Sequence, residues 1–283
     1  MRINKLKLYD FRCFEYCELK LSDRFTLLIG DNGSGKTAIL DGFAITVGDF
    51  VEKVFGIPMK QRILQSDIRY EEMMIGQSVV REIGNITSVK VSGVFNNQNV
   101  EWERYKNLKT NRQYVKGFNK LKSSTDTKLK SNIPVIAYYK TSRLWLGKPS
   151  WYGNFVTLSP KSRLFGYNEC LSNLADNLKL LFIWFKTQEL IALQEKQEIY
   201  ILEAVRKAII NMIPNAKNVF WSIKLDELVI ETELQGKLQS LPFRLLSDGY
   251  RNMIGMVADI AYRMATLNPQ LEKDVIKQTE GIV

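Results

Sequence analysis

The stretch Gly30-Asp31-Asn32-Gly33-Ser34-Gly35-Lys36-Thr37 matches the pattern G-x-x-x-x-G-K-[ST] at every fixed position. An apolar run, Phe25–Ile29, precedes it and predicts a buried strand. Residues 37–47 follow it with apolar side chains at helical spacing. A strand, a glycine-rich loop and a helix in this order form a phosphate-binding loop, or P-loop. The sequence therefore predicts an α/β fold with a site for a nucleoside triphosphate, which we expect to be ATP.

The chemistry of such a site explains the residue types in the loop. Glycines let the backbone curl so that successive N–H groups point at phosphate oxygens, and the N-terminus of the next helix faces the same phosphates. The Lys36 ammonium would reach the β- and γ-phosphates, and the Thr37 hydroxyl would bind Mg²⁺. The residues expected to contact the nucleotide are Asn32, Gly33, Ser34, Gly35, Lys36, Thr37 and Ala38.

A second short motif, Leu246-Ser247-Asp248-Gly249-Tyr250-Arg251, begins a helix predicted over residues 249–266. Taken alone it is an ordinary helix N-cap, because Ser and Asp are favoured at that position. In a chain that also has a P-loop, a second anion-binding helix start is the stronger interpretation.

Composition excludes several classes of protein. The 283 residues carry 40 Lys or Arg, 30 Asp or Glu and no His, which rules out His-dependent nucleophiles and His-ligated metal sites. Three scattered cysteines are too few for a disulfide framework or a four-cysteine zinc site and suit a reducing cytoplasm. No apolar run approaches the length that spans a bilayer, so we expect a cytoplasmic protein without a membrane contact.

The positive charge is concentrated in residues 104–148, which contain twelve Lys or Arg and one acid, Asp126. One interpretation is a solvated surface insertion, and the other is a DNA or RNA contact through phosphates. Tyr105, Tyr114 and Phe118 lie within the segment and could stack on bases.

The remaining hydrophobic pattern predicts further strands and helices. Strands are expected over residues 1–9 and 133–139, with hairpins over 89–105 and 219–233. Helices are expected over 169–190 and 192–212. We divide the chain into an ATPase lobe with the P-loop (1–50), an inserted region with the basic segment (51–132) and the rest of the core with a helical lobe (133–283).

The two motifs together resemble ABC-type ATPases of the SMC and RecF kind, within the AAA family ATPases. The segment Phe11-Arg12-Cys13-Phe14 ahead of the P-loop belongs to the same resemblance. It implies a mixed β-sheet with helices on both faces, a helical lobe and a basic insertion. It also implies that Arg12 lies near the nucleotide. Ser247, Asp248 and Gly249 would complete the partner's site in an ATP-dependent homodimer, although Asp248 departs from the usual Ser-Gly-Gly.

ABC-type ATPases also carry a glutamine-bearing loop that senses the γ-phosphate and Mg²⁺. By this resemblance, Gln65-Ser66-Asp67-Ile68-Arg69 is the candidate loop, and Gln65 and Asp67 join Thr37 as candidate metal ligands. An ordinary polar surface turn is the alternative interpretation of the same residues.

Further motifs along the chain narrow the resemblance to one group of ABC-type ATPases. Ile136-Ala137-Tyr138-Tyr139, Arg143-Leu144-Trp145 and Val257-Ala258-Asp259-Ile260-Ala261 resemble bacterial ATPases that include the Septu anti-phage (PtuA-like) proteins and retron-associated relatives. This resemblance implies a sensor or scaffold subunit of an antiviral defence complex that acts with a separate nuclease subunit. The alternatives are a DNA-repair ATPase of the RecF or SMC class and a nucleotide-binding module that does not hydrolyse ATP.

The catalytic carboxylates of such ATPases follow an apolar strand that ends in Asp-Glu (the Walker B strand), and this sequence contains no such run. Asp226-Glu227 follows Lys224 and fits a hairpin turn better. Glu280-Gly281-Ile282-Val283 resembles the first residues of that strand. We therefore expect a fragment whose catalytic residues lie after Val283 and whose own hydrolysis of ATP is slow or absent. A naturally shortened protein is the alternative.

Overall fold

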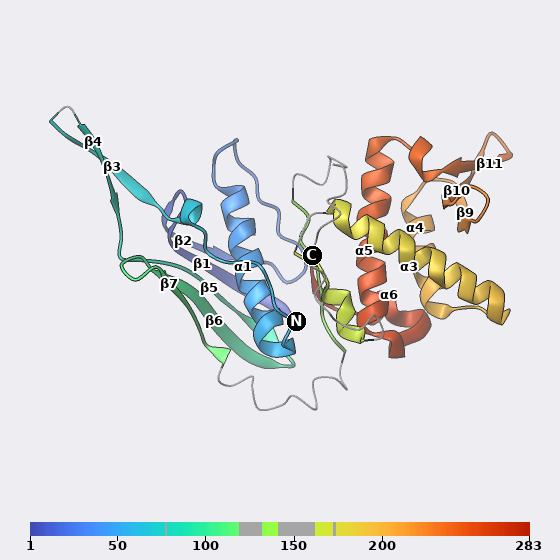
Figure 1. The fold of residues 1–283 in the computed structure, drawn as a ribbon, viewed down its shortest axis with the longest axis horizontal. Coiled ribbons are helices and arrows are strands. Elements are labelled where there is room, and N and C mark those ends of the chain that lie inside the picture. The colour runs from blue at the N-terminus through green and yellow to red at the C-terminus, as the bar shows by residue number, and fades with distance from the viewer. Residues whose placement is uncertain (77, 119–131, 141–161, 172–173) are drawn as a thin grey trace. The chain divides into compact units, whose positions relative to one another are not determined.

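The computed structural model describes residues 1–76, 78–118, 132–140, 162–171 and 174–283 (Figure 1). The chain forms two compact units, Met1–Lys128 and Leu129–Val283. The basic residues at 120, 122, 128, 130, 143 and 148, and the Arg143-Leu144-Trp145 motif, lie outside the described residues.

Unit 1 contains a five-stranded antiparallel sheet in the order β2-β1-β5-β6-β7. Its strands are β1 (Arg2–Phe11), β2 (Phe14–Lys20), β5 (Ile86–Phe95), β6 (Gln98–Asn107) and β7 (Arg112–Lys116). Asn96 and Asn97, both at positive φ, join β5 to β6 as a two-residue turn, which confirms the predicted hairpin. The sheet combines strands from residues 1–50 and 51–132, which the sequence pattern had assigned to separate regions.

Helix α1 (Lys36–Phe55) covers one face of this sheet. Strand alternation places Leu6, Leu8 and Val89 on that inner face, where all three are buried. The Trp102 indole N–H donates to the Thr46 carbonyl over 2.8 Å. Arg104 forms a buried ion pair with Asp49 of α1. Removing one partner of a pair like this costs about 3–5 kcal/mol, because the other charge stays buried.

Two further elements of unit 1 follow α1. A short 3₁₀ turn, η1 (Gln65–Asp67), precedes a hairpin of β3 (Tyr70–Ile75) and β4 (Ser78–Ile83). The hairpin extends away from the sheet, and its described residues are all exposed (Figure 1).

Unit 2 is the helical lobe, and it carries two small sheets. Its helices are α3 (Leu174–Glu195), α4 (Tyr200–Met212), α5 (Asp248–Leu267) and α6 (Val275–Gln278). An antiparallel sheet has the order β11-β10-β9, with β9 (Ala216–Ser222), β10 (Glu227–Leu234) and β11 (Lys237–Pro242). Strand β8 (Val135–Ile136) pairs in parallel with β12 (Gly281–Ile282), so residues 281–282 do form a strand.

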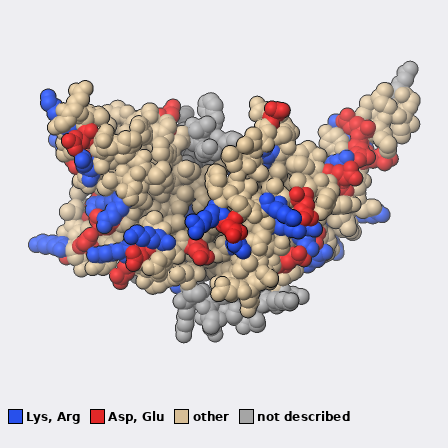
Figure 2. All heavy atoms as spheres, turned by 180° about the vertical axis from the view of Figure 1, so that it is seen from behind, with Lys and Arg blue, Asp and Glu red and all other residues tan. Residues whose placement is uncertain are grey.

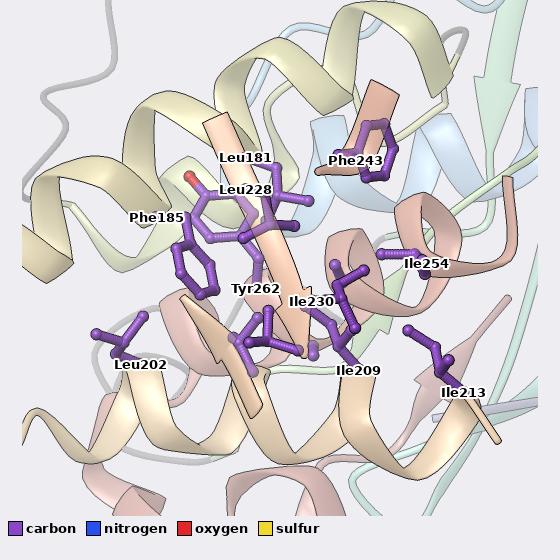
Figure 3. Packing of buried hydrophobic residues seen from close by; sticks show 14 residues of the cluster. Leu181, Phe185, Leu202, Ile209, Ile213, Leu228, Ile230, Phe243, Ile254 and Tyr262 are labelled. Carbon is purple, nitrogen blue, oxygen red and sulfur yellow. The ribbon is translucent and has the colours of Figure 1, made fainter. Parts of the chain in front are cut away.

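The core of unit 2 lies between its helices and β10 (Figure 3). Leu181 and Phe185 of α3, Ile209 of α4 and Ile230 of β10 all point into it. A buried polar network lies on α5, where Asp259 accepts from the Arg263 guanidinium and the Tyr139 hydroxyl. Arg263 also donates to the carbonyls of residues 166 and 168. Both members of this buried charge pair thus have hydrogen-bond partners, as burial requires.

The α/β class is confirmed, with a difference in how the strands are grouped. The expected mixed sheet appears, among the described residues, as four separate sheets, and only the β8–β12 pair is parallel. Helix α4 begins at Tyr200 rather than 192, and the expected strand over 133–139 is reduced to β8 within a buried extended segment. Charged side chains of both signs are interspersed over the surface shown in Figure 2.

The strand predicted over Phe25–Ile29 is wrong. These residues have no regular secondary structure and belong to no ladder among the described strands, and the Ile29 side chain is 86% exposed. Apolar residues favour an extended backbone, but a strand also needs a neighbouring strand to accept and donate its hydrogen bonds. No described segment of the chain does this for residues 25–29.

Candidate nucleotide-binding site

The P-loop folds around the side chain of its own lysine. Lys36 Nζ donates to the carbonyl oxygens of Gly30 and Asp31, each over 2.6 Å, and lies 3.4 Å from Ser34 Oγ. The loop therefore surrounds a positive charge at the place where a P-loop lysine meets phosphate oxygens.

Two glycines give the loop its path. Gly33 and Gly35 have φ of 87° and 90°, a region that L-residues with a side chain rarely adopt. A Cβ on Gly35 would also lie 2.5 Å from the Phe14 ring and 2.8 Å from Cys13 Sγ. The loop thus packs directly on the turn between β1 and β2, which explains why a Phe-Arg-Cys-Phe turn and a glycine-rich loop occur in the same chain.

Helix α1 begins without an acceptor of its own. Its N-cap is Gly35, no side chain caps it, and its first turn contains no acid. The N–H groups at the start of a helix need acceptors, and the helix dipole favours an anion there. Asn32, Ser34 and Thr37 are exposed beside this terminus, whereas Ala38 is buried and offers only its N–H. This arrangement fits a nucleotide phosphate, with the Thr37 hydroxyl open to Mg²⁺.

Arg12 connects α1 to the η1 turn. Its Nη1 lies 2.9 Å from Asp41 Oδ2 of α1, and its Nε donates to Asp67 Oδ1 over 2.8 Å. The Arg12 backbone N–H donates to the Asp67 carbonyl over 2.8 Å. Partial burial opposes the charged form of Arg12, but hydrogen bonds to Asp67 and Asp41 outweigh it and raise its pKa. In this arrangement Arg12 contacts two carboxylates, and its phosphate contact stays a prediction.

The two candidate metal ligands of the η1 turn differ in accessibility. Asp67 is buried, and its two oxygens accept from Arg12 Nε and from the Leu64 N–H. Its carboxylate is therefore used to hold the turn against Arg12. Gln65 is exposed, and its Oε1 lies 3.5 Å from Nζ of Lys106. Of the two, Gln65 is the one whose side chain is exposed and takes part in no ion pair between charged groups, so it is the stronger candidate for a metal ligand.

The second motif lies in unit 2, at the start of α5. Ser247 is its N-cap, and the Ser247 hydroxyl accepts from the Tyr250 N–H over 3.4 Å. Asp248 pairs with Arg251 one turn later. Gly249 has open space around it, since a Cβ there would meet nothing within 4 Å. All three predicted signature residues are exposed at one helix end, where a second molecule can reach them.

The basic segment is less exposed than its composition suggested. Arg104 and Lys106 are buried on the inner face of the sheet, and Phe118 packs on Trp102 with ring centroids 5.5 Å apart. These three residues are therefore wrong as nucleic-acid contacts. Strand alternation causes the error, because every second residue of β6 points toward α1.

Sequence reasoning missed the residues that support the site. Asp41 was overlooked, although it lies one helical turn after Thr37 and so on the same side of α1. Phe14 belongs to the Phe-Arg-Cys-Phe motif, but the sequence did not indicate that its ring packs against Gly35 of the P-loop.

Two features are absent from the described residues. No group of three His, Cys, Asp or Glu side chains there could hold a metal ion on its own. No helix there combines the length and the apolar character needed to cross a membrane.

The fold and the loop define a P-loop nucleotide-binding protein, and comparison with known proteins gives its family. The family described as AAA domain matches residues 5–217, well over half of the chain. The chain therefore belongs to the AAA domain family.

The chain is also similar to individual proteins, over very different shares of its length. The retron Vc95 probable ATPase of Vibrio cholerae serotype O1 biovar El Tor is 25% identical over 328 residues, which cover 96% of this chain and 62% of that protein. DNA replication and repair protein RecF of Aliivibrio salmonicida is 46% identical over 41 residues, 14% of this chain and 11% of that protein. The chain thus spans less than two thirds of the length of these relatives. The solved SMC head domain from Thermotoga maritima is 16% identical, with a TM-score of 0.49, and the match covers 100% of this chain and 88% of that one.

Proposed function

We propose that this chain binds ATP with Mg²⁺ at the P-loop and dimerises in an ATP-dependent manner. The observation that carries this proposal is the start of α1, where the Lys36 ammonium and an uncapped helix N-terminus meet in one glycine-rich loop. Both features favour a polyphosphate. Lys36 would contact the β- and γ-phosphates, and Thr37 and Gln65 would supply oxygen ligands to Mg²⁺.

The dimer follows from the second motif. Ser247, Asp248 and Gly249 would contact the γ-phosphate held by the partner, so that each nucleotide lies between two chains. Their exposure at the start of α5 supports this role. Arg12 would transmit ATP binding from α1 to the η1 turn, since it forms ion pairs with Asp41 of α1 and Asp67 of η1.

In the cell we propose a cytoplasmic sensor or scaffold subunit of a bacterial anti-phage defence complex that passes its ATP-bound state to a separate nuclease. The match to a retron-associated probable ATPase over 96% of this chain supports this assignment. The segment 104–148 would add a DNA or RNA contact through those of its basic residues that face solvent. A RecF-like role in DNA repair is the second candidate, supported by the local match to RecF.

Hydrolysis is expected to be slow in this chain. P-loop ATPases use a carboxylate to hold Mg²⁺ and a second group to orient the attacking water. Residues 1–283 contain no apolar run that ends in Asp-Glu, and Asp226 lies in the turn between β9 and β10, where it contacts Lys186.

The test is ATP binding by calorimetry, combined with phosphate release and light scattering, on the chain and on Lys36→Ala. We expect Mg²⁺-ATP binding, a shift from monomer to dimer and little phosphate release. Lys36→Ala should weaken binding at least about tenfold, because a charge-assisted contact is worth about 1.5–3 kcal/mol. Equal affinity of the two proteins would refute the site. ATP binding without a dimer would refute the role assigned to Ser247.

A further inference from the structure

A row of tyrosines crosses the outer face of the five-stranded sheet, opposite α1. The strand register aligns Tyr16 of β2 with Tyr9 of β1, and Tyr9 with Ser88 of β5. It then aligns Ser88 with Tyr105 of β6, and Tyr105 with Tyr114 of β7. Directly paired residues share one face of a sheet, so these five side chains form a continuous row.

The tyrosines of this row are open to solvent although they are large and partly apolar. Tyr9, Tyr16 and Tyr114 are 49%, 57% and 42% exposed. Tyr105 and Tyr114 stack with ring centroids 5.3 Å apart, and Tyr16 donates its hydroxyl to Glu18 over 2.9 Å. The small Ser88 lies between the two tyrosine pairs. The rings are therefore held in place by neighbours on the face and not by a core.

The rows beside the tyrosines are rich in lysine. We call the whole surface the tyrosine face; it comprises Lys5, Lys7, Tyr9, Tyr16, Glu18, Lys20, Ser88, Lys90, Ser92, Glu101, Glu103, Tyr105, Arg112, Tyr114 and Lys116. It carries six basic and three acidic side chains. Figure 2, which shows the molecule from behind, has Lys and Arg side chains close to Asp and Glu side chains.

The three acids of the tyrosine face are each paired with a lysine of the same face. Glu18 lies 2.8 Å from Lys5 and 2.9 Å from Lys7. Hydrogen bonds from Lys5, Lys7 and Tyr16 lower the pKa of Glu18 to about 2, so it stays ionised and paired near neutral pH. Lys90 pairs with Glu101, and Lys116 with Glu103. Lys116 Nζ also lies 5.1 Å from the centre of the Tyr105 ring. The surplus charge of the face is positive.

We propose that the tyrosine face binds single-stranded nucleic acid, with bases stacked on the tyrosines and the phosphate backbone along the lysines. Exposed aromatic side chains on a sheet, with basic residues beside them, are the two elements that such binding needs. Duplex nucleic acid hides its base faces inside the helix and cannot use the rings in this way. This inference deepens the nucleic-acid contact proposed above and assigns it to the sheet, independently of ATP binding.

The test uses fluorescence anisotropy with a labelled single strand of about 15 nucleotides, as DNA and as RNA, and with the matching DNA duplex. The variants are Tyr9→Thr and Tyr114→Thr, because threonine preserves strand propensity but removes the ring. Tyr9→Phe and Tyr114→Phe retain the ring. Tyr70→Thr is the matched control, since Tyr70 is a 50% exposed strand residue of the β3–β4 hairpin and does not belong to the tyrosine face. Thermal unfolding checks that each variant is folded.

We expect each Tyr→Thr change on the face to weaken single-strand binding about tenfold, within the range of about 5- to 150-fold for the loss of one stacked base. The Phe variants and Tyr70→Thr should stay within about twofold of the unmodified chain. A preference of DNA over RNA, or the reverse, would identify which single strand is bound.

Three results would overturn the proposal: no single-strand binding, equal binding of single strand and duplex, or Tyr→Thr variants that bind like the original chain. The last would leave phosphate contacts alone as the source of affinity. Lys36→Ala separates this proposal from the ATP site, because it should lose ATP and keep the oligonucleotide. Failure of ATP binding by the unmodified chain would count against the proposed function only.

Discussion

Helices α1 and α5 both begin within a glycine-containing motif, but their N-termini are completed differently. Helix α1 starts at Gly35 with no side chain to accept from its first N–H groups. Helix α5 starts at Ser247, whose hydroxyl accepts from the Tyr250 N–H, and Asp248 adds an acid to the first turn. One helix start therefore lacks an internal acceptor, and the other provides its own.

This difference explains why the two sites should respond differently to nucleotide. The first N–H groups of α1 have no side-chain cap, so an external anion can accept from them, as the proposed primary phosphate site requires. The start of α5 is already satisfied within its own chain. A phosphate there must compete with the Ser247 cap and with Asp248, so the signature should add affinity only when a second chain already holds ATP.

The largest effect is expected from Gly35→Ala, which alters the start of α1. The new Cβ would meet the Phe14 ring and Cys13 Sγ at a positive φ, so the P-loop must move. We expect ATP affinity to fall at least tenfold and the free energy of unfolding to fall by about 1–3 kcal/mol. Calorimetry with ATP and chemical denaturation measure the two changes. Gly33→Ala is the comparison, since a Cβ there meets nothing within 4 Å and only the strain of its φ remains.

A selective effect is expected from Ser247→Arg. A bulky side chain at the start of α5 should block closure of the dimer, because it would occupy the space that the partner's nucleotide needs. ATP affinity of the monomer should change less than about twofold, as no contact at α1 is altered. Light scattering with and without ATP reports the dimer. Persistence of an ATP-dependent dimer in this variant would show that α5 does not face the partner's nucleotide.

The smallest effect is expected from Ser247→Ala. Loss of the cap leaves the Tyr250 N–H without its acceptor and should lower the free energy of unfolding by about 1 kcal/mol. Ser247→Gly should lower it by only a few tenths, roughly 0.3 kcal/mol, because glycine is itself a tolerated N-cap. Denaturant titrations of the two variants in parallel measure the difference. Equal stability of both variants and the original chain would mean that the weak 3.4 Å contact contributes nothing.

Local patterns predicted the parts of the fold that depend on neighbouring residues. The Asn96-Asn97 turn was correct because positive φ at both positions is a preference of asparagine itself. The stop of α4 before Pro214 was correct because proline cannot continue a helix. The strand at Phe25–Ile29 failed because it requires a partner strand, which no local pattern can supply.

The candidate sites also divide into features that neighbouring residues determine and features that depend on distant residues. The P-loop could be read from the sequence, since its glycines, lysine and threonine lie within eight consecutive residues whose order determines the chemistry. Arg104 and Lys106 were misjudged because their composition says nothing about which face of β6 they occupy. The ion pairs of Arg12 with Asp41 and Asp67 connect residues up to 55 positions apart, so the sequence alone could not predict them.

By itself, the sequence determined that this chain holds a phosphate-binding loop and a helix with a signature-like start, because both are made of adjacent residues. Only the tertiary structure decided which tyrosines share a surface. Tyr9, Tyr16, Tyr105 and Tyr114 come from four strands, and the hydrogen-bond register alone brings them into one row. A shift of one residue in any of these strands would turn its tyrosine toward α1.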